Sequence, residues 1–366
     1  MKILIFAGYF YPHTGGLESY VLKISQKLIK AGNEITIACP NTENYKESET
    51  LEKINIIRFK AIDLMKVYPI IYYKNKILSI LSKEKFDLII TNTRFFHTSL
   101  IGMKFAKKNK IPWIHIEHGT SFVQTNNPIV WLGSRLYDFT FGKKVLKNAD
   151  KVICISKDSK RFVQSLVNRD VEVVYNGIEL SNIPKYTPKK QIKNIIFVGR
   201  LIYAKGVQDL INAFAQLENK DLKLTIVGDG PYKKDLEELT KKLNLNNRII
   251  FTGEKNKKEV LDLLSKSDLF INPSYSEGLP TSVLEAGAVG LPVIATDVGG
   301  TNEVIINNIT GILINQKDPK EIKEAIEFYI NHPKEKTKYS IALNKLIKSQ
   351  FDWNKIIQQW KTILKK

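Results

Sequence analysis

The stretch SDLFINPSYSEGLPTSVLEAGAVGLPVIAT, residues 267–296, decides the fold because it contains a strand, a turn, a helix and a second strand in succession. Its first part, DLFINPS, is a short apolar run typical of a buried strand. The Gly-Leu-Pro turn leads into a helix that we predict from Thr281 to Val289, with Pro280 suited to its first turn. The run from 292 to 300 is the next expected strand, so the stretch predicts two parallel strands joined by a helix.

The same alternation of apolar runs and helical-period segments fills most of the 366-residue chain. The strands expected in the first half are residues 2–8, 34–40, 54–59, 86–92, 112–119, 151–156 and 171–177. Those expected in the second half are residues 194–200, 222–230, 248–254, 267–274, 292–300 and 311–315. These runs are continuously apolar, which indicates sheets covered by helices on both faces. We therefore predict an α/β fold with parallel, doubly wound sheets.

A break in this alternation at residues 178–194 divides the chain. This segment contains two prolines, a Ser-Asn pair and four lysines, a composition typical of a linker. We predict two Rossmann-like domains, 1–180 and 181–351, and a final helix over 352–366 that packs back on the first domain. Asp352 is its expected N-cap. Its predicted apolar face consists of Trp353, Ile356, Ile357, Trp360 and Ile363.

Composition is that of a globular protein, with 43% hydrophobic residues and no apolar run of the length that a membrane span needs. The N-terminal run lacks a small-residue cleavage site and enters a Gly-Gly turn, so we interpret it as a buried strand rather than a signal peptide. Cys39 and Cys154 lie in strand-like runs and are expected to be reduced core residues. These features favour a cytoplasmic protein.

The formal net charge is +19, carried by 49 lysines and only seven arginines. A dedicated nucleic-acid reader would be expected to use more arginine, so we predict no nucleic-acid partner. Residues 66–110 carry ten of the basic residues against two acids, and 67–85 is an expected amphipathic helix rich in Tyr, Ile and Lys. This region predicts peripheral attachment to an anionic membrane surface. The alternative to a basic patch is that lysine is spread over every exposed face of the protein. The alternative to a membrane-binding helix is that the helix is buried on its own sheet.

Turns that follow strands are where doubly wound sheets bind ligands. Gly15 and Gly16 precede a helix after the first strand and favour close approach of a phosphate, although a plain tight turn explains them too. Arg200 and Lys205 flank a short loop after the first strand of the second domain, and two fixed cations there suit a diphosphate. The alternative is that both are solvated surface charges.

Glu277 and Glu285 stand on either side of the turn at residues 278–280. The helix start leaves the N–H groups of Leu279, Thr281 and Ser282 without intrahelical acceptors. An anion held there would lie between two carboxylates that accept hydrogen bonds from hydroxyl groups. A nucleoside diphosphate sugar matches this layout, because its diphosphate lies between the ribose diol and the sugar diol. The alternative is a pair of surface acids that the helix dipole favours.

Taken together, these motifs resemble the retaining glycosyltransferases of the GT-B fold, in the large subfamily classed as family 4. The resemblance rests on EGLPTSVLEA, on FVGRL followed by KG, on VGDGP and YNGI, and on the N-terminal Gly-Gly turn. It covers nearly the whole chain with the motifs in the same order. It implies two Rossmann-like domains that face a central cleft.

The resemblance also implies a role for each site residue. Glu277 and His118 would be catalytic, with Glu277 near the reacting sugar carbon and His118 near the primary hydroxyl. Gly278 and Pro280 would contact the sugar, and Glu285 the ribose. Glu254 and Lys255 would line the base. The donor diphosphate would be held by Gly16, Arg200, Lys205, Leu279 and Thr281.

By this resemblance the donor is a UDP- or GDP-linked sugar, and the chemistry is metal-independent and retains the anomeric configuration. We find no Asp-x-Asp pair in a plausible loop, so no metal ligand or other cofactor is expected. The expected acceptor is a hydroxyl of a glycan or a lipid-linked sugar in cell-envelope polysaccharide synthesis, such as lipopolysaccharide or capsule, at the inner face of the membrane. A GT-B-fold sugar-nucleotide epimerase and a non-catalytic nucleotide-sugar binding module are the alternatives. A dinucleotide-dependent dehydrogenase would need G-x-G-x-x-G after its first strand, and this sequence lacks that motif there.

Overall fold

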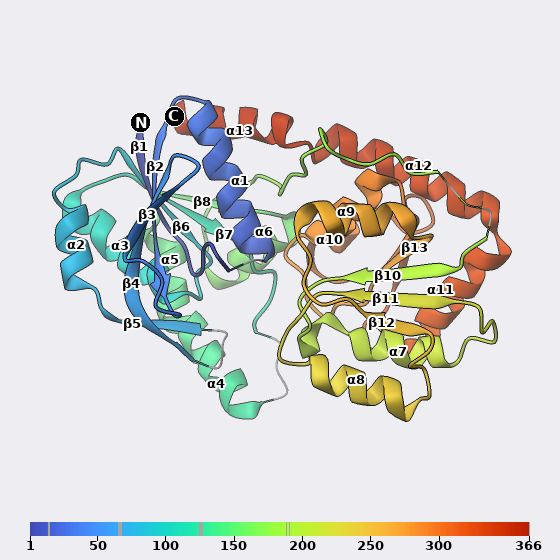
Figure 1. Cartoon of the computed structure of the whole chain (residues 1–366). Helices are drawn as coiled ribbons and strands as arrows, with labels where there is room; N and C mark the ends of the chain where they lie inside the picture. Colours follow the sequence, from blue (N-terminus) through green and yellow to red (C-terminus); the bar gives the residue numbers. More distant parts are fainter. Residues whose placement is uncertain (14, 65–67, 124–126, 188, 190, 366) are drawn as a thin grey trace. The chain divides into compact units, whose positions relative to one another are not determined.

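The computed structural model describes residues 1–13, 15–64, 68–123, 127–187, 189 and 191–365 (Figure 1). Within them the chain forms two compact units. The first unit consists of Met1–Val174 with Gln359–Lys366, and the second of Tyr175–Gln358. The last helix, α13 (Trp353–Lys365), therefore begins in the second unit and ends in the first.

Helix α13 has the predicted cap and the predicted apolar face. The side chain of Asp352 accepts a hydrogen bond from the Asn354 N–H at 2.9 Å. All of the side chains that make up the predicted face are buried, namely Trp353, Ile356, Ile357, Trp360 and Ile363. An amphipathic helix of this length is stabilised mainly by burial of such a face.

The first unit is built on a sheet with nine strands among the described residues, in the order β3-β4-β2-β1-β6-β7-β8-β9, with β5 beside β4. The strands are β1 (Lys2–Phe6), β2 (Glu34–Asn41), β3 (Ser48–Leu51), β4 (Ile54–Leu64), β5 (Tyr68–Tyr73), β6 (Leu88–Asn92), β7 (Trp113–Glu117), β8 (Lys151–Cys154) and β9 (Glu172–Val173). Its helices are α1 (Gly16–Lys30), α2 (Asn75–Leu81), α3 (His97–Asn109), α4 (Pro128–Tyr137), η1 (Asp138–Gly142), α5 (Lys143–Asn148) and α6 (Lys157–Leu166). All pairings are parallel except those of β3 and β5 with β4.

One sequence prediction in this unit is wrong, and one strand was missed. The amphipathic helix expected at 67–85 is instead strand β5 followed by the short helix α2, while Val67 lies outside the described residues. Tyr and Ile side chains favour the strand, and β5 adds to the sheet by antiparallel pairing with β4. Strand β3, which has no continuous apolar run, was not expected. Cys39 and Cys154 are buried and unbridged, as predicted.

The second unit is built on a sheet of six parallel strands among the described residues, in the order β12-β11-β10-β13-β14-β15. The strands are β10 (Asn194–Val198), β11 (Lys223–Val227), β12 (Ile249–Phe251), β13 (Leu269–Asn272), β14 (Val293–Thr296) and β15 (Ile312–Ile314). Its helices, with α13, are η2 (Tyr203–Lys205), α7 (Val207–Ala215), α8 (Lys233–Lys242), α9 (Lys257–Lys266), α10 (Thr281–Val289), η3 (Gly299–Glu303), α11 (Pro319–Asn331) and α12 (Pro333–Gln350). Figure 1 shows α7 and α8 on one face of this sheet and α9 and α10 on the other. The predicted α/β class with doubly wound parallel sheets is confirmed.

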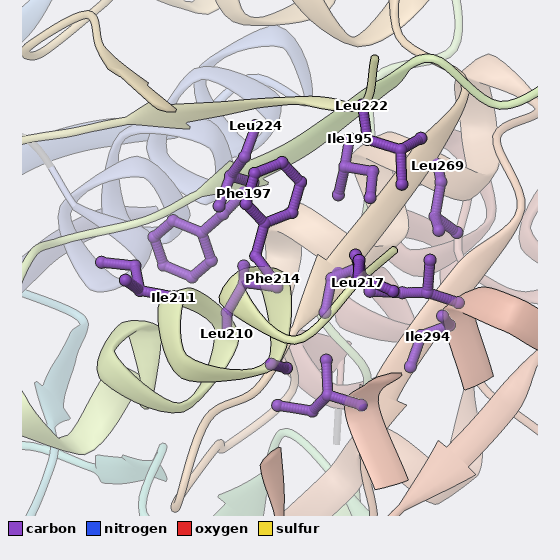
Figure 2. Close-up of a cluster of buried hydrophobic side chains, with 14 of the residues drawn as sticks. Ile195, Phe197, Leu210, Ile211, Phe214, Leu217, Leu222, Leu224, Leu269 and Ile294 are labelled. Atoms are coloured by element: carbon purple, nitrogen blue, oxygen red, sulfur yellow. The ribbon is translucent and has the colours of Figure 1, made fainter. Parts of the chain in front are cut away.

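Successive side chains of each strand point to opposite faces of the sheet, and each face carries a layer of buried apolar side chains. In Figure 2, Ile195 and Phe197 of β10 face Leu210, Ile211 and Phe214 of α7, and all five side chains are fully buried. Each such side chain stabilises the fold by roughly 1.5–3 kcal/mol relative to exposure. The layers hold the carboxyl ends of β10 and β13 rigidly side by side, which is where the sheet reverses its strand order. Ligands of doubly wound sheets bind at this reversal point.

Candidate active site

Two loops of the second unit leave the sheet at its reversal point. The loop after β10 carries Arg200 and Lys205, and the loop after β13 carries Glu277. The ammonium group of Lys205 donates a hydrogen bond to Oε1 of Glu277 at 2.7 Å. Arg200 is exposed, two residues beyond the end of β10. The structure therefore brings Lys205, which is predicted to bind the donor diphosphate, into contact with the predicted catalytic residue Glu277.

The Glu277 side chain is also held by the last residue of β13 and by the loop that follows this strand. Ser274 donates its hydroxyl hydrogen to Oε1 at 2.6 Å, and the amide of Asn272 donates to the same oxygen at 3.3 Å. Glu277 is 8% exposed, so these bonds offset the cost of removing its charge from water. Sequence reasoning missed Asn272 and Ser274, although polar residues at and just after the carboxyl end of a buried strand are a readable signal.

Contacts between the two loops fix Lys205 opposite Glu277. The N–H of Tyr275 donates to the carbonyl of Ala204 at 2.8 Å, and the rings of Tyr275 and Tyr203 meet edge to face at 5.4 Å. The hydroxyl of Tyr275 donates to Asp209 at 2.7 Å. Burial and this bond to Asp209 raise the pKa of Tyr275, so it remains a protonated donor at neutral pH.

Gly206 lies against the chain at Pro273, and its φ of +66° lies in the left-handed region. A Cβ there would lie 1.9 Å from the carbonyl oxygen of Pro273. We expect Gly206→Ala to destabilise the protein by more than the roughly 1–3 kcal/mol that a left-handed alanine costs by itself. Gly253→Ala is the matched control, because Gly253 has φ +71° but no atom within 4 Å of its added Cβ. Urea unfolding of both variants checks the difference, and equal losses would contradict the described packing of the loops.

Glu285 lies on α10 and is bonded to the ammonium group of Lys257, the first residue of α9. Glu254 and Lys255, the predicted base-binding residues, come just before this helix start, where Asn256 and Glu259 form a capping box. Glu254 is exposed, and Lys255 is partly exposed with its Nζ 3.9 Å from Glu259. Lys257 was missed because its bond with Glu285 joins two different helices.

The start of α10 carries the remaining predicted contacts. Leu279 and Pro280 are buried, and the carbonyl of Gly278 accepts a hydrogen bond from the N–H of Gly300 at 3.1 Å. Pro280 precedes the first helical residue, Thr281, and its carbonyl accepts the N–H of Val283. The N–H groups before Val283 precede the first intrahelical bond, and the positive end of the helix dipole lies there.

The other two predicted site residues belong to the first unit. Gly16 is the first residue of α1. His118 follows β7 and is half-buried, with Nε2 3.3 Å from the amide oxygen of Asn92 and its ring 4.9 Å from that of Tyr20. Burial lowers the pKa of His118 to about 4, even though Glu117 opposes the shift. His118 is therefore a neutral imidazole at neutral pH, able to donate one hydrogen bond and accept another.

This pKa predicts an acid-dependent loss of stability. The ordinary pKa of histidine is 6.5. Between pH 6.5 and pH 4, the unfolded chain therefore binds a proton at His118 that the folded chain does not bind. The free energy of unfolding should therefore fall as the pH decreases through this window, and less steeply in His118→Gln. Urea unfolding of both proteins across the window measures the difference. The same slope in both would show that the pKa of His118 is not depressed.

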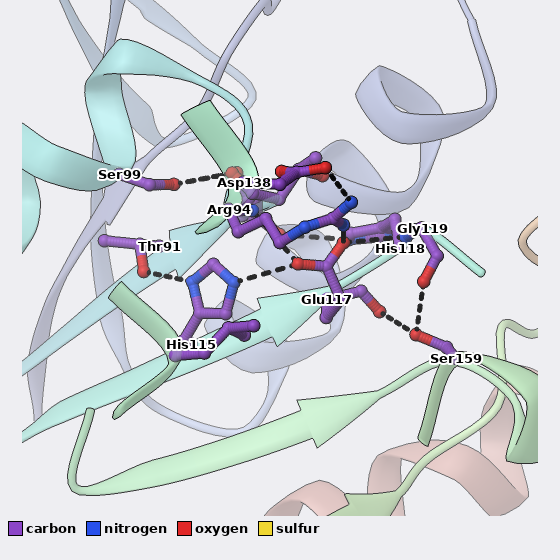
Figure 3. Close-up of polar contacts among 12 residues, drawn as sticks. Thr91, Arg94, Ser99, His115, Glu117, His118, Gly119, Asp138 and Ser159 are labelled. Atoms are coloured by element: carbon purple, nitrogen blue, oxygen red, sulfur yellow. Dashed lines mark hydrogen bonds and ion pairs between the residues drawn. The ribbon is translucent and has the colours of Figure 1, made fainter. Parts of the chain in front are cut away.

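A buried ionic cluster lies beneath the loop that carries His118 (Figure 3). The guanidinium of Arg94 donates to Glu117 at 3.0 Å and to Asp138 at 2.9 Å. The carboxylate of Glu117 also accepts the N–H groups of Arg94 and Gly119, at 3.1 and 2.7 Å, and lies 3.4 Å from Nε2 of His115. Burial by itself would raise the pKa of Glu117, but Arg94 and His115 lower it to about 2. The cluster thus ties β7, the His118 loop and η1 together. Sequence reasoning missed this cluster.

Comparisons with known proteins identify the family of the chain. The family model described as "Glycosyltransferase Family 4" matches residues 14–182, and the one described as "Glycosyl transferases group 1" matches residues 180–345. An uncharacterized glycosyltransferase of Methanocaldococcus jannaschii is 36% identical, over 100% of this chain and 98% of its own length.

The chain belongs to the group 1 glycosyltransferases.

More distant relatives include the GPI3 subunit of phosphatidylinositol N-acetylglucosaminyltransferase from Saccharomyces cerevisiae, which is 24% identical over 96% of this chain and 80% of its own length. The fold is similar to that of sucrose-phosphate synthase from Thermosynechococcus elongatus, with a TM-score of 0.83 at 20% identity, covering 100% of this chain and 98% of that one. It is also similar to Anabaena HepE in complex with UDP-glucose, with a TM-score of 0.81 at 21% identity, covering 100% and 99%. The predicted GT-B fold of this glycosyltransferase is confirmed.

Two further findings concern the described residues. No group of three or more His, Cys, Asp or Glu side chains in the described ranges could hold a metal ion. Every helix in the same part of the chain is too short or too polar to cross a lipid bilayer.

Proposed function

We propose that this glycosyltransferase moves a sugar from a UDP- or GDP-linked donor to a hydroxyl of a glycan or lipid-linked acceptor, with retention of the anomeric configuration. The observation that carries the proposal is the contact of Lys205 with Glu277 at the reversal point of the second unit's sheet. A cation and a carboxylate fixed 2.7 Å apart suit the junction between a diphosphate and a sugar. The complex of Anabaena HepE with UDP-glucose supports the donor class.

Breaking the bond between the sugar and the diphosphate separates charge. The leaving diphosphate gains negative charge, which Arg200, Lys205 and the start of α10 would stabilise together with Leu279, Thr281 and Gly16. The anomeric carbon becomes cationic, and Glu277 would orient the sugar hydroxyls beside it, with Gly278 and Pro280 shaping the same turn. Glu285 would accept hydrogen bonds from the ribose, and Glu254 with Lys255 would line the base. His118, as a neutral imidazole, would bond a sugar hydroxyl.

Retention follows in the proposal from attack on the face that the diphosphate leaves. The acceptor oxygen forms a bond to the anomeric carbon while the bond from that carbon to the phosphate oxygen breaks. The acceptor proton passes to the departing phosphate oxygen, so no protein base is consumed. The side chains that would offset the diphosphate charge are cations, and we propose that no metal or other cofactor is required. We expect full activity in excess chelator. We also expect the transferred sugar to have the same anomeric configuration in the product as in the donor, measured from its anomeric coupling constant.

The proposed setting is the inner face of the membrane, in synthesis of a cell-envelope polysaccharide such as lipopolysaccharide or capsule. The net charge of +19 and the basic residues of 66–110 support attraction to an anionic surface. Acceptors anchored in that surface would then be presented at a high local concentration.

A panel of nucleotides and nucleotide sugars tests the donor site. UDP or GDP should raise the melting temperature, and the corresponding monophosphates should raise it less, since they lack the second phosphate that Arg200 and Lys205 would hold. The matching nucleotide sugar should also be hydrolysed slowly in the absence of acceptor. No stabilisation by any nucleoside diphosphate, or equal stabilisation by the monophosphates, would contradict the proposal.

A further inference from the structure

Asn92, the last residue of β6, contacts the imidazole ring of His118. The amide oxygen of Asn92 lies 3.3 Å from Nε2 of His118, and Asn92 is only 1% exposed. The ring of Tyr20 on α1 meets the same imidazole edge to face, with 4.9 Å between the ring centroids. Contacts from two separate elements therefore fix the plane of the His118 ring, and the contact from Asn92 is polar.

The amide of Asn92 also contacts β1, and this second contact fixes its orientation. The Nδ2 group of Asn92 donates to the carbonyl oxygen of Phe6 at 3.5 Å. If the amide were rotated by half a turn, its oxygen would face the carbonyl oxygen of Phe6, and neither atom could donate a hydrogen bond to the other. The oxygen of Asn92 therefore faces His118.

This orientation decides which ring nitrogen of His118 carries the proton. An amide oxygen only accepts hydrogen bonds, so the proton of the neutral imidazole lies on Nε2. The lone pair then lies on Nδ1, which makes no hydrogen bond to any residue that the structure describes. His118 is half-buried, so part of the ring is accessible to a ligand.

A nitrogen with a lone pair accepts a hydrogen bond from a hydroxyl group and cannot donate one. We propose, on the basis of the proposed function, that Asn92 is a positioning residue that fixes the Nε2–H tautomer of His118. Nδ1 of His118 then accepts a hydrogen bond from a hydroxyl of the donor sugar. The site thereby selects a sugar that has a hydroxyl at this position over one that has only an acceptor atom there, such as fluorine.

Thr91, the neighbour of Asn92 on β6, contacts a different histidine, His115 (Figure 3). Oγ1 of Thr91 lies 2.8 Å from Nδ1 of His115, and the indole N–H of Trp113 donates to the same oxygen at 2.8 Å. Successive residues of a strand point to opposite faces of the sheet, so Thr91 and Asn92 act on opposite faces. Thr91→Val is therefore a matched control for Asn92→Leu, because it removes buried hydrogen bonds without changing the partner of His118.

Nuclear magnetic resonance of protein containing ¹⁵N-labelled histidine tests the tautomer without donor or acceptor, so its failure is separate from failure of the proposed chemistry. A ring nitrogen that carries a proton and one that carries a lone pair have well-separated ¹⁵N shifts, and His118→Gln identifies the signals of His118. At neutral pH the wild type should show a protonated Nε2 and an unprotonated Nδ1. In Asn92→Leu both shifts should move toward those of a mixture of the two tautomers, whereas Thr91→Val should leave them unchanged.

Slow hydrolysis of the donor links the tautomer to the site. The probe is whichever of UDP-glucose and GDP-mannose the wild type hydrolyses in the absence of acceptor. Asn92→Leu should lower kcat/KM by about tenfold, the order of effect found when the partner that orients a functional histidine is lost. In the His118→Gln background the same change should cost no more than about twofold, because Asn92 acts through His118.

Three results would overturn the proposal. The first is a wild-type His118 with its proton on Nδ1, and this result is decisive even if Asn92→Leu fails to fold. The second is the same pair of His118 shifts in the wild type and in Asn92→Leu. The third is an equal loss of kcat/KM from Asn92→Leu with and without His118. If neither donor is hydrolysed while the Nε2–H tautomer is observed and depends on Asn92, the donor class is wrong and the role of Asn92 in fixing the tautomer is confirmed.

Discussion

Replacing Lys205 by methionine is expected to lower kcat for sugar transfer by about 10²–10³-fold, comparable to the loss of one oxyanion donor. Lys205 lies 2.7 Å from Glu277, so the variant would lose both a cation for the leaving diphosphate and the partner that orients the carboxylate. The measurement is kcat at saturating donor, with the melting temperature recorded to show that the fold is kept.

Lys223→Met is the matched control for this variant. Lys223 begins β11 of the same sheet, at the end of the strand opposite to the carboxyl end, and its ammonium group donates to the carbonyl of Asn247 at 2.8 Å. Its loss should change kcat by no more than about twofold, since surface substitutions away from a site have small effects. Comparable activity in Lys205→Met and Lys223→Met would exclude Lys205 from the chemistry.

Arg94→Met is expected to have the largest effect on stability, a loss of about 3–5 kcal/mol, because it leaves buried carboxylates without their cation. Glu117 and Asp138 are both fully buried and both accept from Arg94. The free energy of unfolding in urea measures the loss. Arg94→Lys should recover only part of it, since one ammonium group does not reproduce the planar fork that reaches two carboxylates.

Two controls separate uncompensated charge from lost packing. Arg161→Met removes an exposed arginine that pairs with Asp158 on α6, and it should cost less than about 1 kcal/mol. Combining Arg94→Met with Glu117→Gln and Asp138→Asn removes the stranded charges and should restore part of the stability. If the triple variant is less stable than Arg94→Met, stranded charge is not the cause of the loss.

Local patterns predicted the elements that carry the donor side of the site. The helix expected from Thr281 to Val289 is α10 with the same bounds, because a turn, a proline and a following apolar run are signals contained in one short stretch. Parallel pairing followed from the continuously apolar strands at 194–200 and 267–274. These patterns also placed Lys205 and Glu277 after two different strands. The contact between the two residues could not be predicted without knowing the order of the strands in the sheet.

Features that depend on distant segments were not predictable in the same way. Strand β5 resembles an amphipathic helix because its Tyr and Ile residues run into the lysines of residues 74–85, and only pairing with β4 decides between the two. The partners Glu285 and Lys257 lie on separate helices. Arg94 and Asp138 meet only because β6 and β7 are neighbours, which brings the ends of several segments to one edge of the sheet.

A crystal structure of the protein with bound UDP or GDP tests the central claim most directly. The predicted result is a diphosphate within hydrogen-bond distance of Arg200 and Lys205 at the start of α10, with the ribose hydroxyls bonded to Glu285. A nucleotide bound away from the ends of β10 and β13, or a Glu277 side chain turned away from the diphosphate, would contradict it.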